Sequence, residues 1–129
     1  HMEVPMQHTN QWQSSPISAR NLDIYMVILE LIAYCKPLVP RITRFNKRSA
    51  NQLIESLLST EQNLSEGMRR TGADRAHFLT IMLGSADEVR AILDGAHAFG
   101  IITPQELQGA DALADRICAM GYRLRQKSR

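Results

Sequence analysis

Three long stretches of this 129-residue chain repeat apolar residues at helical spacing, and only short turns separate them. They begin near Asn46, Thr71 and Thr103, and each is about 24–27 residues long, or roughly 36–40 Å at 1.5 Å per residue. A further apolar helix precedes them. Because short connections make neighbouring helices antiparallel, the pattern predicts an all-α, up-down-up-down four-helix bundle.

The first helix is expected to begin near Asn21, a residue type that favours the N-cap. Pro37 and Pro40 end or kink it, because each removes a backbone donor and clashes with the preceding turn. In the second helix, Glu61 interrupts an otherwise apolar stripe. The core positions expected on that helix are Ala50, Leu53, Leu57, Leu64 and Met68, with Ile54 and Leu58 beside them.

Turn residues mark the boundaries of the last two helices. Thr71, with Asp74 three residues on, is the expected N-cap of the third helix, and Gly100 is the glycine that ends it. Thr103-Pro104-Gln105-Glu106 is a capping box with proline at the first helical position. The core positions expected on the third helix are Leu79, Met82, Leu83, Ala86, Val89, Leu93 and Ala96.

Composition agrees with a single helical domain, since only 5% of the residues are aromatic and 44% are hydrophobic. We interpret His1-Met2 as a cloning scar and residues 1–19 as a flexible tail, which leaves residues 20–129 for the bundle. No apolar run approaches the ~20 residues needed to cross a membrane. Cys35 and Cys118 are expected to be free, buried thiols in a reducing, cytoplasmic compartment.

Gly67 and Gly84 lie well inside predicted helices, where glycine costs roughly 1 kcal/mol relative to alanine. Close approach of the second and third helices is the expected reason for both.

The third helix carries more apolar surface than one bundle can bury. Beside the core stripe, Phe78, Ile81, Ser85 and Ile92 form a second, adjacent stripe. The first helix is also apolar around most of its circumference. Because exposed apolar patches mark interfaces, we expect self-association through the first and third helices, with Phe78, Ile81 and Ile92 in the oligomer interface. The alternative is that a kinked first helix or the N-terminal tail covers the patch within one chain.

Nothing in the sequence points to catalysis. Asp74-x-x-His77 and Asp94-x-x-His97 approach the Glu-x-x-His motif of bundle metal sites, but they lie about 30 Å apart on one helix. Glu66 and Glu88 are interpreted as structural carboxylates, since no nucleophile with a base, phosphate-binding glycine loop or Cys/His cluster accompanies them. We therefore expect no enzyme, no cofactor, no bound metal and no small-molecule substrate.

Basic residues gather in two groups without acidic neighbours, although the net charge is only +2. In an up-down bundle the group from Lys36 to Arg48 lies at one end. The C-terminal group lies at the other, beside the turn that joins the second and third helices. That second end could meet a polyanion; the alternative is that charged ends keep the bundle soluble. The candidate nucleic-acid contacts are Arg69, Arg70, Arg75, Arg123, Arg125 and Lys127.

A family resemblance is carried by a few segments of the second and third helices. They are Asn63-Leu64-Ser65-Glu66-Gly67, Arg69-Arg70, Phe78-Leu79-x-Ile81-x-Leu83-Gly84-Ser85-Ala86-x-Glu88 and Leu93-x-x-Ala96-x-x-Phe99-Gly100. The chain thereby resembles the bacterial four-helix-bundle proteins, also called 23S rRNA intervening-sequence proteins. Many members have a proline in the middle of the second helix, where this chain has Glu61.

The resemblance implies a homopentamer, a ring of bundles around a channel, with no catalytic activity and a role that is unknown for most members. The chain is also similar to the accessory variability determinant of diversity-generating retroelements, a basic pentameric bundle that binds a reverse transcriptase and nucleic acid. By position, the resemblance implies a structural role at the helix crossing for Asn63, Glu66, Gly67, Gly84, Ser85 and Glu88. The expected function is a non-catalytic scaffold or adaptor, and the alternative is an accessory protein that binds RNA or DNA.

Overall fold

The computed structural model describes residues 18–128, and these residues form helices without any strand. Of the tail expected over residues 1–19, residues 1–17 lie outside the described residues, as does Arg129. The prediction is wrong for Ser18 and Ala19, because Ser18 caps η1 and Ala19 is buried in the core. The helices in chain order are η1 (Ala19–Asn21), α2 (Asp23–Cys35), η2 (Lys36–Leu38), α3 (Val39–Phe45), α4 (Lys47–Met68), α5 (Gly72–Ala98) and α6 (Pro104–Ser128).

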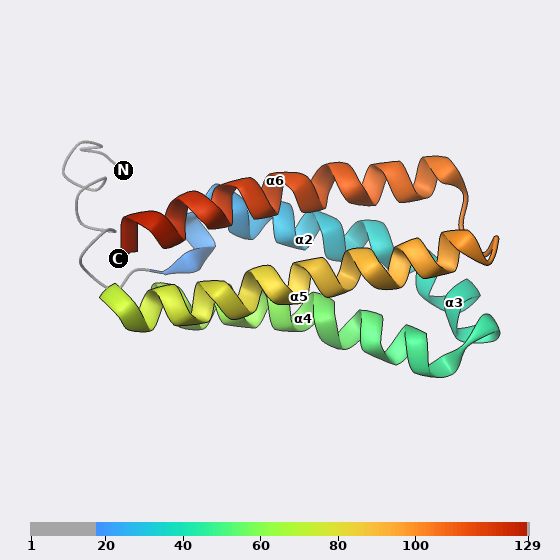
Figure 1. Ribbon diagram of the computed structural model, residues 1–129, viewed down its shortest axis with the longest axis horizontal. Coiled ribbons are helices and arrows are strands. Elements are labelled where there is room, and N and C mark those ends of the chain that lie inside the picture. Colours follow the sequence, from blue (N-terminus) through green and yellow to red (C-terminus); the bar gives the residue numbers. More distant parts are fainter. Residues whose placement is uncertain (1–17, 129) are drawn as a thin grey trace.

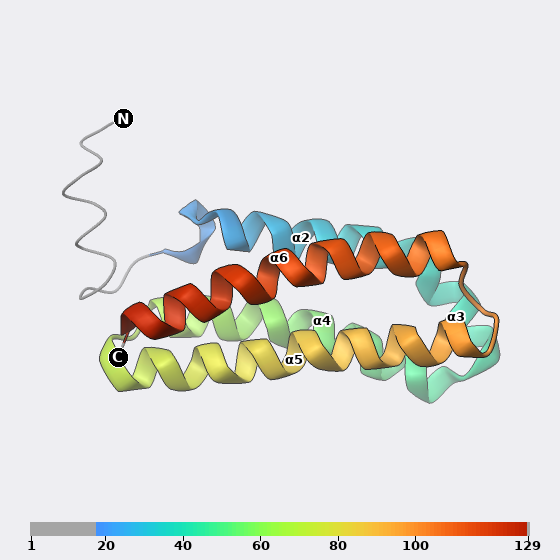
Figure 2. The same ribbon diagram turned by 45° about the horizontal axis from the view of Figure 1, so that its top comes forward.

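Four helices run alternately in opposite directions along the long axis of the molecule (Figures 1 and 2). α4 packs on α5, α5 on α6, and α2 on both α4 and α6. The predicted all-α, up-down-up-down bundle is therefore confirmed for the single chain. The short helix α3 packs on α4 at the end of the bundle opposite the end of α6.

The core consists of the apolar stripes predicted for α4 and α5. Ala50, Leu53 and Leu64 are among the least exposed residues of α4. Every predicted core position on α5 is buried as well. The shared core also takes in Val27, Ile28 and Leu31 from α2, and Ala110, Ile117 and Leu124 from α6.

Two of the boundary predictions are confirmed. Gly100 has φ +74° and ends α5, with its amide donating to the His97 carbonyl oxygen at 2.8 Å. At the start of α6, the Glu106 amide donates to Thr103 Oγ1 at 3.1 Å, and the Thr103 amide donates to Glu106 Oε1 at 2.9 Å. These reciprocal bonds are those of a capping box, so the spacing of Thr103 and Glu106 in the sequence predicted this turn correctly.

Of the two other predicted N-caps, Asn21 is wrong and Thr71 is correct in position. α2 begins at Asp23 with Leu22 in the N-cap position and no side-chain bond there, because Asn21 belongs to the preceding turn η1. Thr71 does occupy the N-cap of α5, but its side chain makes no capping bond. Asn46 is the side chain that does cap a long helix, since its Oδ1 accepts a bond from the Ser49 amide at 2.8 Å.

Pro37 and Pro40 bend the path between α2 and α4 without opening a loop. Pro37 lies in the 3-10 turn η2, and Pro40 lies at the start of α3. Both are positions where a missing backbone N–H costs little. Helical turns therefore follow one another from Asp23 to Phe45, and only the extended Asn46 separates α3 from α4.

The explanation of close helix approach holds for Gly67 and fails for Gly84. A Cβ on Gly67 would lie 3.1 Å from Phe78 Cβ, whereas nothing lies within 4 Å of a Cβ on Gly84. Gly84 is exposed on the single bundle. Two glycines of α6 are also tight, because a Cβ on Gly121 would lie 2.6 Å from Met82 Cε and a Cβ on Gly109 would clash with the Tyr34 hydroxyl of α2.

Candidate interaction surfaces

The second apolar stripe of α5 is divided between surface and interior. Ile81 is 38% exposed, while Phe78 and Ile92 are half-buried. The guanidinium of Arg70 lies over the Phe78 ring at 5.0 Å from its centroid. Of the three predicted interface residues, only Ile81 is thus an exposed apolar side chain on the single chain.

A larger apolar surface lies where α2 meets α4. We call it the α2–α4 seam, and it consists of Met26, Leu29, Ile54 and Leu58. These four side chains are between 38% and 55% exposed, so they present more open apolar surface than the predicted stripe on α5. The first helix was expected to take part in an interface, but Ile54 and Leu58 were expected only as neighbours of the core.

A hydrogen bond sets the register of this seam. The Tyr25 hydroxyl on α2 donates to Glu61 Oε2 on α4 at 3.3 Å. Leu29 follows Tyr25 by one turn and Leu58 precedes Glu61 by about one turn, so these two leucines lie at the same level of antiparallel helices. The bond also explains Glu61, whose carboxylate additionally accepts from Ser65 Oγ at 3.3 Å.

Polar side chains join α4 to α5 beside Ile81. Ser59 Oγ and Ser85 Oγ are 2.7 Å apart, and Asn63 Nδ2 donates to the Ser59 carbonyl oxygen at 2.9 Å and to Ser59 Oγ at 3.0 Å. Asn63 and Ser85 therefore lie at the helix crossing as expected. Gly84 and Glu88 are exposed and lie outside this network.

The basic residues near the α4–α5 turn have different surroundings. Glu66 forms ion pairs with Arg69 and Arg70, and these hydrogen bonds lower the pKa of the Glu66 carboxyl. Arg75 is only 1% exposed, and its Nε donates to the Arg70 carbonyl oxygen at 2.9 Å and to that of Gly67 at 3.3 Å. Arg75 thus satisfies carbonyls at the end of α4 and presents no charge to a polyanion, which corrects its assignment as a nucleic-acid contact.

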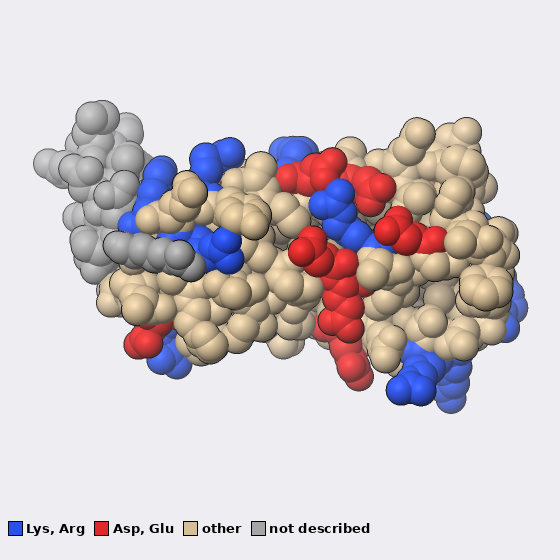
Figure 3. All heavy atoms as spheres, viewed as in Figure 1, with Lys and Arg blue, Asp and Glu red and all other residues tan. Residues whose placement is uncertain are grey.

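The α4–α5 turn and the last turns of α6 lie at the same end of the bundle, as predicted. Lys and Arg side chains gather over this end in Figure 3. Arg123 is exposed, and with Lys127 it borders a pocket of about 330 Å³ at the start of α2. Arg125 lies over the Tyr122 ring at 4.6 Å and donates to Thr80 Oγ1 at 3.3 Å.

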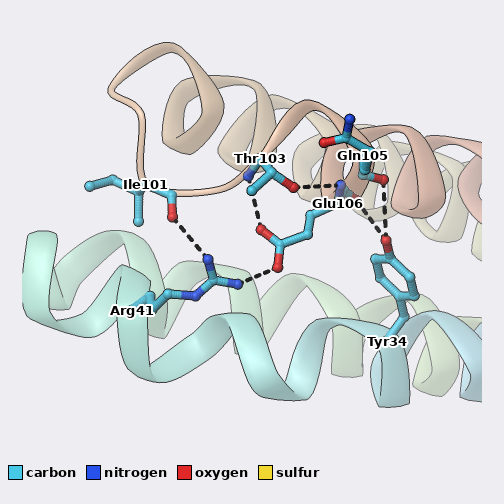
Figure 4. Close-up of polar contacts among 6 residues, drawn as sticks. All are labelled: Tyr34, Arg41, Ile101, Thr103, Gln105 and Glu106. Atoms are coloured by element: carbon cyan, nitrogen blue, oxygen red, sulfur yellow. Dashed lines mark hydrogen bonds and ion pairs between the residues drawn. The ribbon is translucent and has the colours of Figure 1, made fainter.

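At the opposite end, Arg41 is part of a structural network that the sequence did not reveal (Figure 4). It forms an ion pair with Glu106 and donates to the Ile101 carbonyl oxygen at 3.4 Å. The Tyr34 hydroxyl donates to the Glu106 carbonyl oxygen at 3.0 Å. The bond from Arg41 lowers the pKa of the Glu106 carboxyl, and the network ties α2 and α3 to the start of α6.

An aromatic pair is exposed at this same end. Phe45, the last residue of α3, and Phe99, which follows α5, have ring centroids 5.0 Å apart and planes inclined by 41°. Phe99 is 72% exposed, the largest fraction among the exposed large hydrophobic residues described. The sequence singled out Phe99 only as part of the family motif and did not single out Phe45, because neither residue falls in an apolar stripe.

No cluster of three or more His, Cys, Asp or Glu residues with metal-ligand geometry occurs within residues 18–128. His77 and His97, considered above as parts of metal motifs, both lie on α5. In the same part of the chain, no helix combines the length and apolar character needed to cross a membrane. Cys35 is a free, buried thiol whose pKa burial raises to about 11, and Cys118 is a free, half-buried thiol.

Comparison with known proteins places the chain in a family. The profile of the 23S rRNA-intervening sequence protein matches residues 20–123, which include α2, α4, α5 and most of α6. The comparisons with curated proteins and with solved structures gave no match. The match confirms the resemblance carried by α4 and α5: the chain belongs to the 23S rRNA-intervening sequence protein family.

Proposed function

We propose that this protein is a non-catalytic scaffold or adaptor that assembles as a homo-oligomer, with the pentameric ring implied by the family resemblance as the expected form. The observation that carries the proposal is the open apolar surface of the α2–α4 seam together with Ile81. A helix of a lone bundle normally turns polar residues outward. Apolar side chains exposed in a row on two adjacent helices instead indicate a partner surface.

The two apolar surfaces lie on different faces of the chain. On α4, the exposed polar residues Asn51, Glu55 and Gln62 separate the seam from the side that contacts α5 near Ile81. Contact between unlike faces of successive subunits is heterologous, and such contacts close into rings when the rotation permits. A ring in which the seam of one subunit packs beside Ile81 of the next agrees with this arrangement.

Light scattering during size-exclusion chromatography tests the proposal. The chain should elute as an oligomer at micromolar concentration, and Leu58→Asp or Ile81→Asp should dissociate it without loss of helical content. Gln62→Asp is the matched control, because it places the same charge on the polar side of α4. A wild-type chain that is monomeric under these conditions would refute the assembly.

A second candidate function is an accessory protein that binds RNA or DNA, with a reverse transcriptase as a further partner. It is favoured by the cations at the α6 end, which we define as the exposed Arg69, Arg70 and Arg123 and the half-buried Arg125. An oligomer would repeat this group around the ring and raise its local potential.

This candidate predicts binding that falls steeply with salt. Replacing the four arginines of the α6 end by glutamine should weaken binding and reduce the salt dependence together. Absence of binding to mixed nucleic acids at ~50 mM salt would exclude this function.

A further inference from the structure

The end of the bundle that carries α3 combines exposed aromatic rings with unopposed positive charge. We define the α3 end as Phe45 and Phe99 with Arg44, Lys47 and Arg48. Residues 31–54 contain five cations and no acidic residue, and residues 95–105 contain no acidic residue either. Glu106, which lies in the first turn of α6 at this end, is already paired with Arg41.

The aromatic pair is held in place by the fold. Phe45 ends α3 beside Asn46, whose side chain caps α4, and Phe99 precedes Gly100, whose positive φ ends α5. The Arg41 side chain joins the same two regions, because it lies on α3 and donates to the carbonyl oxygen of Ile101, which follows Gly100, at 3.4 Å. The rings are therefore presented by rigid turns, and ordering them on binding costs little conformational entropy.

A shallow hollow adjoins the pair. It measures about 380 Å³ and is lined by Arg41, Arg44, Phe45, Gly100 and Ile101. In Figure 3 most of the acidic side chains lie over the middle of the molecule, while basic side chains project at the end where α3 and the start of α4 lie. The exposed aromatic rings thus lie next to basic side chains, and most of the acidic side chains lie farther away.

We propose that the α3 end binds single-stranded nucleic acid, with a base stacked on Phe99 and phosphates held by Arg44, Lys47 and Arg48. Base stacking on exposed aromatic rings, beside a positively charged track, is how proteins bind single strands without reading their sequence. The cations are spread over α3 and the first turn of α4, which suits the repeating charge of a phosphate backbone better than a single carboxylate. The site is separate from the α6 end and does not depend on it.

Fluorescence anisotropy with a labelled oligo(dT) of about 12 nucleotides, within the span of known single-strand sites, measures the interaction. Phe99→Ala should weaken binding about 5- to 100-fold at ~50 mM salt, the range expected for loss of one stacked base. Arg44→Gln and Arg48→Gln should each lower the slope of log affinity against log salt by about 0.7. Gln62→Ala is the control, because Gln62 is exposed on α4 and belongs to neither group of cations.

A spectroscopic readout reports stacking directly. Phe99→Trp in a Trp12→Phe background carries a single indole, since the chain has one tryptophan. Its emission should be quenched by oligo(dT) with the same dissociation constant that anisotropy gives. An indole whose emission does not change while anisotropy shows binding would overturn the stacking.

Three other outcomes would also overturn the proposal. Phe99→Ala could bind oligo(dT) as tightly as the wild type, or dissociate the oligomer, which would make the ring a subunit contact. Poly-glutamate could compete as well as oligo(dT), which would make the surface a site for acidic protein. Loss of binding in the α6-end variant together with full binding in Phe99→Ala would reject this site and leave the second candidate function intact.

Discussion

The Tyr25 hydroxyl donates a hydrogen bond to the Glu61 carboxylate across the α2–α4 seam. This bond gives a half-buried carboxylate in an apolar stripe a partner, and it fixes how α2 and α4 are aligned. Tyr25→Phe should destabilise the bundle by about 1 kcal/mol, the usual net contribution of one hydrogen bond. Urea unfolding followed by circular dichroism measures the change, and Tyr122→Phe on the exposed face of α6 should leave the midpoint unchanged.

Arg75 should behave as part of the core. Its guanidinium donates to the carbonyl oxygens of Gly67, Met68 and Arg70, at and just beyond the end of α4. Arg75→Met should cost about 3 kcal/mol of unfolding free energy, because charge-assisted bonds are lost and buried carbonyls are left unsatisfied. Arg69→Met, on an exposed side chain, should change stability little; equal effects of the two substitutions would contradict the assignment.

Acid should weaken the α3 end of the bundle. The pKa of Glu106 is lowered by its bond from Arg41, so the folded state holds this carboxylate ionised more tightly than the unfolded state does. The stabilisation is present above the unfolded pKa and is lost as pH falls from there through the lower pKa of the folded state. In Glu106→Gln the midpoint of urea unfolding should decrease less as the pH is lowered over this range, whereas Glu55→Gln should behave like the wild type.

The two glycines of the family motif should respond oppositely to alanine. Gly84→Ala meets no atoms and should stabilise the helix by about 1 kcal/mol. Gly67→Ala brings a methyl group against Phe78 and should destabilise the bundle by about 1–3 kcal/mol. If Gly84→Ala instead disrupted the oligomer while raising the stability of the subunit, Gly84 would lie in the contact between subunits.

The helices and their core could be predicted from the sequence because the buried face of a helix repeats apolar residues about every 3.6 positions. Gly100 and the Thr103–Glu106 capping box followed from local turn chemistry. What could not be predicted depends on where helix ends meet in space. The burial of Arg75, the network of Arg41 with Glu106 and the pairing of Phe45 with Phe99 each join residues across a turn or between separate helices.

The interface residues were only partly predictable for the same reason. Apolar spacing identified Phe78, Ile81 and Ile92 as surplus on α5, but their exposure depends on how α4 covers that helix. Packing leaves Ile81 open and shelters the other two in part. The same packing brings Leu29 beside Leu58, and no pattern within either helix alone predicts this pair.

A mixing experiment with two interface variants tests self-association through unlike faces most directly. Wild-type protein should have the mass of a pentamer, about 73 kDa for subunits of 14.6 kDa. Leu58→Asp and Ile81→Asp should each be folded monomers, and an equimolar mixture should form a dimer of about 29 kDa, since each variant keeps the face that the other has lost. Wild-type protein that remains at 14.6 kDa, or variants that stay monomeric when mixed, would contradict the account.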